Sequence, residues 1–277
     1  MTTASPISQS SLLPSVFVPH GAPTFILQPG PAGAAMQGFA QRLPRPKAIV
    51  VITPHWATRQ PTIGAAAQPE TIHDYWGFPA PLYEMRYRAP GAPEVAQQVF
   101  DLLTAAGLDA DLDPRAGLDH GAWMPLQVMF PAADIPVVPL SVQPEADPLH
   151  HYRLGQALAP LREQGVLIVA SGNLTHNLYH YRVAGRSAQV PAYVTAFQGW
   201  VWQQLQAAAG NGDVTALLDY RARAPGGVEA HPTDEHLLPL YVALGAAQPE
   251  AGQGFAVERL YDGIYEYILA MDGFVFQ

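Results

Sequence analysis

The sequence has no cysteine, a single lysine (Lys47) and no apolar run long enough to cross a bilayer. The absence of cysteine excludes disulfides, thiolate metal ligands and a cysteine nucleophile. A membrane-spanning helix needs about 18 or more consecutive apolar residues, so none is expected. Residues 1–15 are rich in Ser, Thr and Pro and lack the basic and apolar regions of a signal peptide. We therefore expect a cytoplasmic protein.

Basic residues are scarce, with 14 Lys and Arg against 23 Asp and Glu and a formal charge of −9. Nucleic-acid binding needs a basic surface, and no basic stripe is present. The hydrophobic fraction of 49% over 277 residues predicts a substantial folded core rather than a disordered chain. The glycine-rich phosphate loops, the Gly-x-Ser-x-Gly elbow and His-Glu-x-x-His are all missing. These absences disfavour nucleotide binding and serine-hydrolase chemistry.

Short apolar runs of strand length alternate with longer helical patterns along the chain. Four such runs cover residues 15–18, 48–53, 135–140 and 166–170. Continuous apolar runs of this length are typical of strands that are buried on both faces. We therefore predict an α/β fold, a three-layer α/β/α sandwich with a mainly parallel central sheet. We expect a single domain over residues 1–277, in which residues 1–14 form a flexible N-terminal segment.

Helix signals are clearest in four regions. Residues 93–106 begin with Pro and end before Gly107, which is the usual asymmetry of helix ends. Residues 147–164 and 191–209 are further predicted helices. Thr233 is a favourable N-cap for a helix over residues 234–244, which would place Leu237, Leu240, Tyr241 and Leu244 on one stripe.

Three of the ten histidines follow predicted strands, at the edge where open α/β sheets bind ligands. These are His20, His55 and His176. A single histidine in such a place is more often a packing or surface residue, but three on one edge favour a metal site. Neutral imidazoles bind zinc when they converge at about 2.0–2.1 Å from one ion. Two more histidines stand out: His120 in a loop before a helical pattern, and His236 in the first turn of the helix that Thr233 would cap.

Six short segments carry most of the histidines, and they occur in order from about residue 16 to residue 270. They are Pro19-His20-Gly21-Ala22-Pro23, Thr53-Pro54-His55-Trp56, Thr71-Ile72-His73-Asp74-Tyr75-Trp76-Gly77-Phe78-Pro79, Leu118-Asp119-His120-Gly121-Ala122-Trp123, Ser171-Gly172-Asn173-Leu174-Thr175-His176-Asn177 and Pro232-Thr233-Asp234-Glu235-His236-Leu237-Leu238-Pro239-Leu240. This set resembles the class III extradiol ring-cleavage dioxygenases, and within them the 4,5-DOPA extradiol dioxygenase subgroup.

The resemblance implies a three-layer α/β/α fold and a non-haem Fe(II) site that opens a catechol ring with O2. It also allows for Zn2+ in the protein as isolated. His20, His55 and His236 match the metal-ligand positions of the family. His176 matches the histidine that acts as acid and base and that could serve as a fourth ligand. His120 matches a second catalytic histidine that faces the substrate.

Two histidines are candidates for the third ligand position, and a histidine at that position departs from a common ligand pattern. His231 precedes Pro232 and could be mistaken for the ligand, but the motif favours His236. Many non-haem iron sites use two His and one carboxylate, whereas this set has three neutral ligands. Three histidines suit Zn2+ equally well, so the ligands alone do not select iron. Glu235 would point about 100° away from His236 on a helix, and we expect it to take no part.

Aromatic residues flank these motifs and predict a flat pocket for a ring. We expect His73, Trp56, Tyr75 and Trp123 to contact the substrate and Trp76 to help wall the pocket, with core packing as the alternative for the aromatic residues. The expected partners are a small catechol and O2, without nucleic acid or membrane, and the expected oligomeric state is a monomer or homodimer. The alternative functions are a zinc-dependent hydrolase or amidase on an α/β scaffold, and a metal-binding module without turnover. Consumption of O2 would separate the dioxygenase from both.

Overall fold

A computed structural model describes residues 12–184, 189–248, 250 and 252–277. The first eleven residues of the predicted flexible segment lie outside this description. Leu13, at the end of that segment, is buried, and its backbone N–H donates to the Arg162 carbonyl at 3.1 Å. The chain therefore enters the described fold at an anchored residue.

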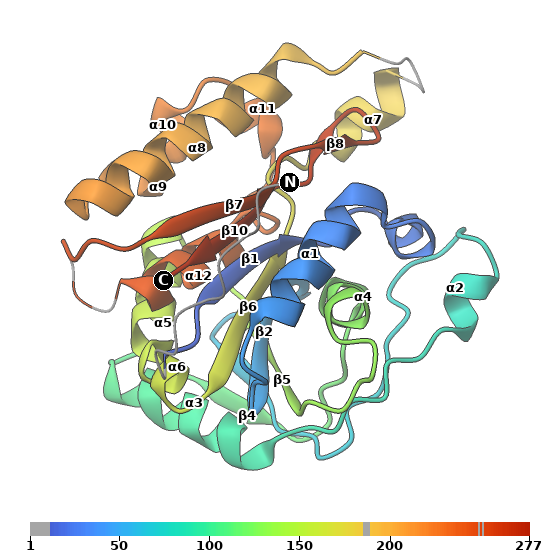
Figure 1. Cartoon of the computed structure of the whole chain (residues 1–277), viewed down its shortest axis with the longest axis vertical. Coiled ribbons are helices and arrows are strands. Elements are labelled where there is room, and N and C mark those ends of the chain that lie inside the picture. The colour runs from blue at the N-terminus through green and yellow to red at the C-terminus, as the bar shows by residue number, and fades with distance from the viewer. Residues whose placement is uncertain (1–11, 185–188, 249, 251) are drawn as a thin grey trace.

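The described strands form one large and one small sheet. The large sheet contains β1 (Ser15–Pro19), β2 (Ala48–Ala57), β3 (Thr62–Gly64), β4 (Asp111–Asp113), β5 (Val137–Val142), β6 (Val166–Gly172), β7 (Val257–Tyr261) and β10 (Gly273–Phe276). Strands β8 (Ile264–Tyr265) and β9 (Leu269–Ala270) pair with each other. The large sheet has the order β4-β3-β5-β2-β6-β1-β10-β7 (Figure 1).

The centre of the large sheet is parallel and its edges are mixed. Strands β5, β2, β6 and β1 pair in parallel, as do β3 and β4. The pairs β3–β5, β1–β10 and β10–β7 are antiparallel. The four predicted apolar runs form the four central strands, although β5 begins two residues later than expected. Strand β2 extends to Ala57, so His55 lies inside its last part rather than beyond it.

Helices cover both faces of the large sheet. They are η1 (Pro23–Leu27), α1 (Gly30–Arg42), α2 (Pro81–Glu84), α3 (Pro93–Ala105), α4 (His120–Met129), α5 (Pro148–Leu158), α6 (Pro160–Glu163), α7 (Leu178–Ala184), α8 (Ala192–Asn211), α9 (Thr215–Leu218), α10 (Tyr220–Arg223), α11 (Gly227–Ala230) and α12 (Leu238–Ala247). Among these described helices, none is both long and apolar enough for a bilayer crossing.

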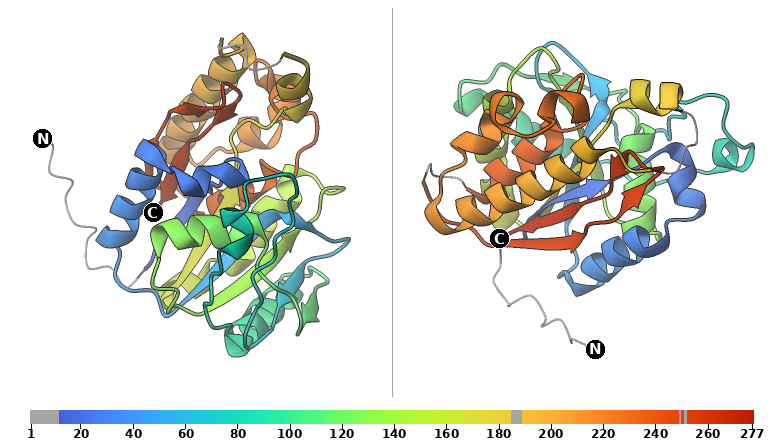
Figure 2. Two further views of the ribbon diagram at one scale, coloured as in Figure 1. Left: turned by 90° about the vertical axis from the view of Figure 1, so that its right-hand side faces the viewer. Right: turned by 90° about the horizontal axis from the view of Figure 1, so that it is seen from above.

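Alternation along β2 divides the core into two layers. Ile49 and Val51 pack in an apolar cluster with residues of α1 and α4. Val50 and Ile52 pack in the other cluster, with residues of α3, α5, α8 and α12. Successive strand residues point to opposite faces, so both faces of β2 are buried. The gold helix α8 and the blue helix α1 accordingly lie on different sides of the sheet (Figure 2). The predicted α/β/α sandwich is confirmed.

Two helix predictions are wrong in their ends. The region predicted as one helix over residues 147–164 divides into α5 and α6, because Pro160 has no N–H to continue the first helix. The helix predicted from residue 234 begins at Leu238, with Pro239 in its first turn. Thr233 does not cap it; the Thr233 hydroxyl donates to Glu235 Oε1 at 3.0 Å instead. The helix α12 is buried on all sides, not along one stripe.

Candidate metal centre

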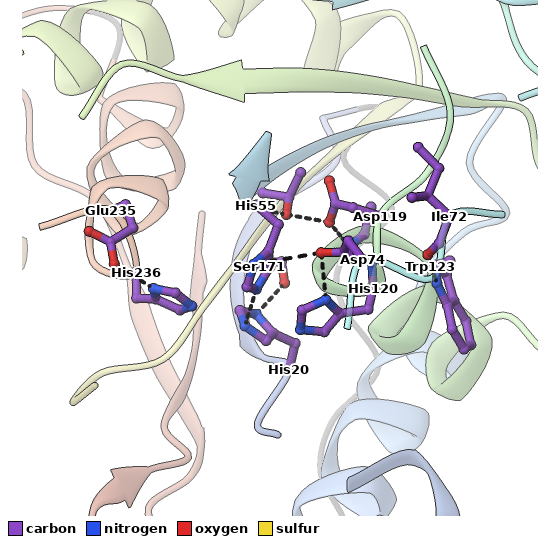
Figure 3. Close-up of polar contacts among 12 residues, drawn as sticks. His20, His55, Ile72, Asp74, Asp119, His120, Trp123, Ser171, Glu235 and His236 are labelled. Carbon is purple, nitrogen blue, oxygen red and sulfur yellow. Dashed lines mark hydrogen bonds and ion pairs between the residues drawn. The ribbon is translucent and has the colours of Figure 1, made fainter. Parts of the chain in front are cut away.

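Three histidines from distant parts of the chain converge at the carboxyl edge of the central strands. His20 follows β1, His55 lies near the end of β2, and His236 lies in the turn before α12. Their candidate ligand atoms all lie within 4.8 Å of one another. The Nε2 atoms of His20 and His55 are 3.2 Å apart. The ring of His236 is 5.4 Å from that of His20 and 5.0 Å from that of His55 (Figure 3).

Residues at the end of β6 fix the position of His20. Ser171 Oγ lies 3.0 Å from His20 Nδ1, and Asn173 Oδ1 accepts from the backbone N–H of Gly21 at 3.0 Å. Gly21 has a φ of +63°, a conformation that residues with a Cβ rarely adopt. These contacts leave His20 Nε2 as the nitrogen that faces His55 and Asn173.

His55 packs against the start of α4 with almost no spare room. A Cβ on Gly121 would come within 2.7 Å of His55 Cδ2 and 2.6 Å of Thr53 Oγ1. The Thr53 hydroxyl donates to Asp119 Oδ1 at 2.7 Å, and the same oxygen accepts from the N–H of Ala122 at 3.1 Å as the helix cap. The absence of a side chain at residue 121 therefore makes space for the imidazole of His55.

His236 is held by its neighbour Glu235, which corrects our expectation for that glutamate. Glu235 Oε1 accepts from His236 Nδ1 at 3.1 Å. The expected separation of about 100° assumed a helix, but this segment is a turn. His236 Nε2 is buried and has no hydrogen-bond partner in the described part of the chain. A buried nitrogen without a partner is costly, and coordination to a metal ion would satisfy it.

Burial keeps the three imidazoles neutral. Desolvation, followed by the nearby histidines, holds the pKa of His20 and of His236 well below the usual value. The same causes, desolvation first and then His120, lower the pKa of His55 to about 3. A metal ligand must offer an unprotonated nitrogen. The convergent Nε2 atoms, their neutrality and the orphaned nitrogen of His236 thus fit a metal ion bound by three histidines.

His176 lies against His236 rather than inside the three-histidine set. The two rings stack with centroids 3.4 Å apart and planes 12° apart. His176 shares a second candidate metal group with Glu235 and His236. Burial, and then the neighbouring His231 and His120, lowers the pKa of His176 to about 3. A cavity of about 190 Å³ opens beside this ring, lined by His176, Leu178, Tyr179, Pro232, Thr233 and Glu235.

The sequence predicted a loop at His120, but His120 is the first residue of α4, directly after the cap residue Asp119. Its ring lies 3.9 Å from that of His55 and 5.6 Å from that of His20. Its backbone N–H and its Nδ1 both face the carboxylate of Asp74, each at 2.8 Å (Figure 3). The helix start therefore places this imidazole beside the three-histidine set.

The predicted aromatic contacts lie at different depths. Tyr75 is 5.6 Å from the His120 ring, and its hydroxyl donates to the Leu82 carbonyl at 2.9 Å. His73 is half-buried, 5.7 Å from Tyr75. Trp123 is fully buried, and its indole N–H donates to the Ile72 carbonyl at 3.0 Å. Trp56 is half-buried directly after His55, whereas Trp76 is 86% exposed. His231 is apart from the set, with Nε2 2.8 Å from the Leu174 carbonyl.

The contacts of Ser171 and Asn173 with His20, and two carboxylate contacts, were not predicted from the sequence. Asp74 bonds to His120, and Glu235 bonds to His236. Both sit inside quoted motifs, and a carboxylate next to a ligand histidine in a turn is a usable signal, since such histidines usually donate their second N–H to an oxygen.

The chain is similar to known proteins over most of its length. Residues 32–269 match the family model described as the catalytic LigB subunit of aromatic ring-opening dioxygenase. The chain is 40% identical over 260 residues to a 4,5-DOPA dioxygenase extradiol of Beta vulgaris, covering 92% of this chain and 94% of that protein. It is 40% identical over 243 residues to the protein of the same name from Escherichia coli K12, covering 87% of each.

A solved structure is also similar. The crystal structure of the uncharacterized protein JW3007 from Escherichia coli K12 superposes with a TM-score of 0.78 at 34% identity, covering 95% of this chain and 99% of that one. The resemblance inferred from the six motifs is thereby confirmed. The chain belongs to the LigB family of aromatic ring-opening dioxygenases.

Proposed function

We propose that this protein is a non-haem Fe(II) extradiol dioxygenase that opens the ring of DOPA or a related catechol with O2 to a muconic semialdehyde. The observation that supports the metal site is the convergence of the imidazoles of His20, His55 and His236, with His236 Nε2 buried and without a partner. The names of the relatives support a DOPA-like substrate. The cytoplasmic location and the monomeric or dimeric state stay predictions from the sequence.

In this proposal His20, His55 and His236 hold the ion through their Nε2 atoms. Ser171 and Glu235 face the Nδ1 atoms of His20 and His236 and so fix the nitrogen that each presents. When bound, Fe(II) would supply Lewis-acid stabilisation of the ionised diol and an electron path to O2. Zn2+ in the same site would supply only the first of these, because it has no redox chemistry.

We assign proton transfer to His176 and His120. His176 stacks on His236 and lines the cavity beside it, and there it would accept a proton from the diol. We keep it as the acid and base rather than as a fourth ligand, because its ring lies parallel to that of His236. His120, on the other side of the cluster, would hydrogen-bond the substrate oxygen or O2.

The residues predicted to contact the substrate differ in how deeply they are buried, and we assign their roles accordingly. Tyr75 lies 5.6 Å from the His120 ring and His73 lies 5.7 Å from Tyr75, so we assign both to the lining of the ring pocket. Trp123 has no exposed surface, so we assign it the support of residues 72–75 from beneath. Trp56 stays a predicted contact. The cavity beside His176 would receive the substituent that distinguishes one catechol from another.

The test is to load the protein with Fe(II) without oxygen and then add DOPA, caffeate or protocatechuate in air. We expect a yellow semialdehyde chromophore and the uptake of one O2 per ring opened. The zinc-loaded protein and the variant His20→Ala serve as controls, and both should stay colourless. Hydrolysis by the zinc form without O2 uptake would instead favour the hydrolase or amidase.

A further inference from the structure

Asp74 holds His120 at two points with one carboxylate. Its Oδ1 accepts from the backbone N–H of His120 at 2.8 Å, and its Oδ2 accepts from His120 Nδ1 at 2.8 Å. The side chain of His120 is only 7% exposed, against 24% for Asp74. Because a carboxylate only accepts, His120 Nδ1 must carry the hydrogen, which leaves Nε2 as the free nitrogen of the ring.

The backbone around Asp74 is built to keep this contact. Thr71 and Leu118 form a parallel bridge, with Ile72 N–H donating to the Leu118 carbonyl at 2.8 Å and Leu118 N–H donating to the Glu70 carbonyl at 2.8 Å. The Trp123 indole donates to the Ile72 carbonyl from within α4. Contacts at Leu118 and at Trp123, on either side of His120 in the sequence, therefore hold the segment that leads to Asp74.

The charge of Asp74 suits this role. Burial raises its pKa, but the hydrogen bonds from His120 outweigh burial and leave the pKa below the ordinary value. Asp74 Oδ2 also lies 3.8 Å from His55 Nδ1, which is beyond hydrogen-bond distance. The contact with His120 is thus the strong one, and the contact with the metal-ligand candidate is weak.

We propose that Asp74 is a positioning residue, which fixes the tautomer and orientation of His120 so that its Nε2 is available to the bound catechol or O2. This inference rests on the proposed function for the role of His120 in turnover. The hydrogen bonds between Asp74 and His120 do not depend on the proposed function, so the tautomer of His120 can be measured without catalysis.

The first experiment measures the histidine tautomer in the zinc-loaded protein by 15N NMR, with the His120 signal assigned by its loss in His120→Gln. We expect the Nδ1–H form in the wild type and a shift toward the Nε2–H form in Asp74→Asn. Asp74→Glu keeps the carboxylate and should restore part of the Nδ1–H population. If Asp74→Asn folds poorly, the wild-type measurement still decides, because the Nε2–H form in the wild type would overturn the proposal. An unchanged tautomer in a folded Asp74→Asn would overturn it too.

The second experiment measures turnover of the iron-loaded variants. We expect kcat of Asp74→Asn to fall by about 10²-fold, within the range for a misplaced acid–base group, with KM and iron content nearly unchanged. In a His120→Gln background, Asp74→Asn should cause no further loss of kcat, because both substitutions remove the same function. The control Asp113→Asn removes a carboxylate at the end of β4, where it accepts from the Arg115 N–H, and should leave kcat unchanged.

Two results would contradict the proposal. Loss of iron from Asp74→Asn would show that Asp74 acts through His55 instead. Additive losses in the double variant would show a general structural role. Failure of the wild type to consume O2 would reject the proposed function alone, and the tautomer measurement would still judge Asp74.

Discussion

His176 and His236 stack face to face, with ring centroids 3.4 Å apart. One of these rings is a proposed metal ligand and the other a proposed acid and base, so their contributions can be separated by substitution. We predict that His176→Ala lowers kcat by about 10²–10⁴-fold yet retains most of the metal, whereas His20→Ala loses the metal. Metal analysis and steady-state kinetics on the same samples provide the measurement.

A matched variant controls for packing in this experiment. His176→Phe keeps a flat ring against His236 but has no nitrogen, so it should be as inactive as His176→Ala while preserving the stack. Equal metal loss in the variants of His176 and His20 would mean that His176 is a fourth ligand.

Gly121, which has no side chain beyond its hydrogen, gives a second prediction. Gly121→Ala would place a Cβ 2.7 Å from His55 Cδ2, which is closer than real Cβ contacts, so the imidazole must move. We expect a metal affinity at least tenfold weaker, measured by competition with a chelator. Gly199→Ala, in the middle of α8 with open space around it, should leave the affinity unchanged and stabilise the helix by roughly 0.5–1 kcal/mol. Normal affinity in Gly121→Ala would show that the site tolerates the shift.

Stability should fall in acid partly because of His151, which is buried in α5. Desolvation lowers its pKa to about 4, and its ring nitrogens bond to the Asp147 carbonyl and the Gln143 N–H. The folded state therefore binds this proton less readily than the unfolded state, whose pKa is about 6.5. Stability is complete above pH 6.5 and is lost as the pH falls toward 4.

At pH 5 this linkage amounts to about 2 kcal/mol in the free energy of unfolding. His151→Gln cannot titrate, so the stability advantage of the wild type over the variant should shrink by that amount between pH 7.5 and pH 5. Urea unfolding of both proteins at the two pH values measures it. A constant difference would mean that His151 titrates normally in the folded state.

Tyr75 tests the pocket for the aromatic ring. Its ring is 5.6 Å from His120, and its hydroxyl bonds to the Leu82 carbonyl. We predict that Tyr75→Ala raises KM for a catechol by about tenfold with a smaller change in kcat, because contact area is lost. Tyr75→Phe keeps the ring, so its KM should match the wild type, at a cost of about 1 kcal/mol in stability. A similar KM in all three proteins would place the substrate elsewhere.

The central strands were predictable because each contains a continuous apolar run. Residues 48–53 are buried on both faces, and such runs have few alternatives in a chain of this composition. The antiparallel strand β10 was not predicted, since its four residues follow short turns that carry no periodic pattern. The histidines at strand ends were predictable for the same reason as the strands, because a parallel sheet brings its carboxyl ends together.

The surroundings of the histidines were harder to predict. Thr233 has the composition of a helix cap, but Pro239 and the burial of the whole of α12 determine where that helix begins. Because the helix begins at residue 238, residues 235 and 236 lie in a turn, where the Glu235 carboxylate can bond to His236 Nδ1. The contact between Asp74 and His120 joins residues 46 positions apart, and no local pattern encodes such a contact.

The three imidazoles come from residues 20, 55 and 236, each held by a different part of the sheet or its connections. A nascent chain cannot complete the site until its last fifth has been synthesised and folded. At the proposed metal site, binding would accordingly be a late event, and its free energy would stabilise the finished fold rather than any fragment. Metal availability would then act as a check on complete folding, with the unmetallated protein the species most exposed to proteolysis.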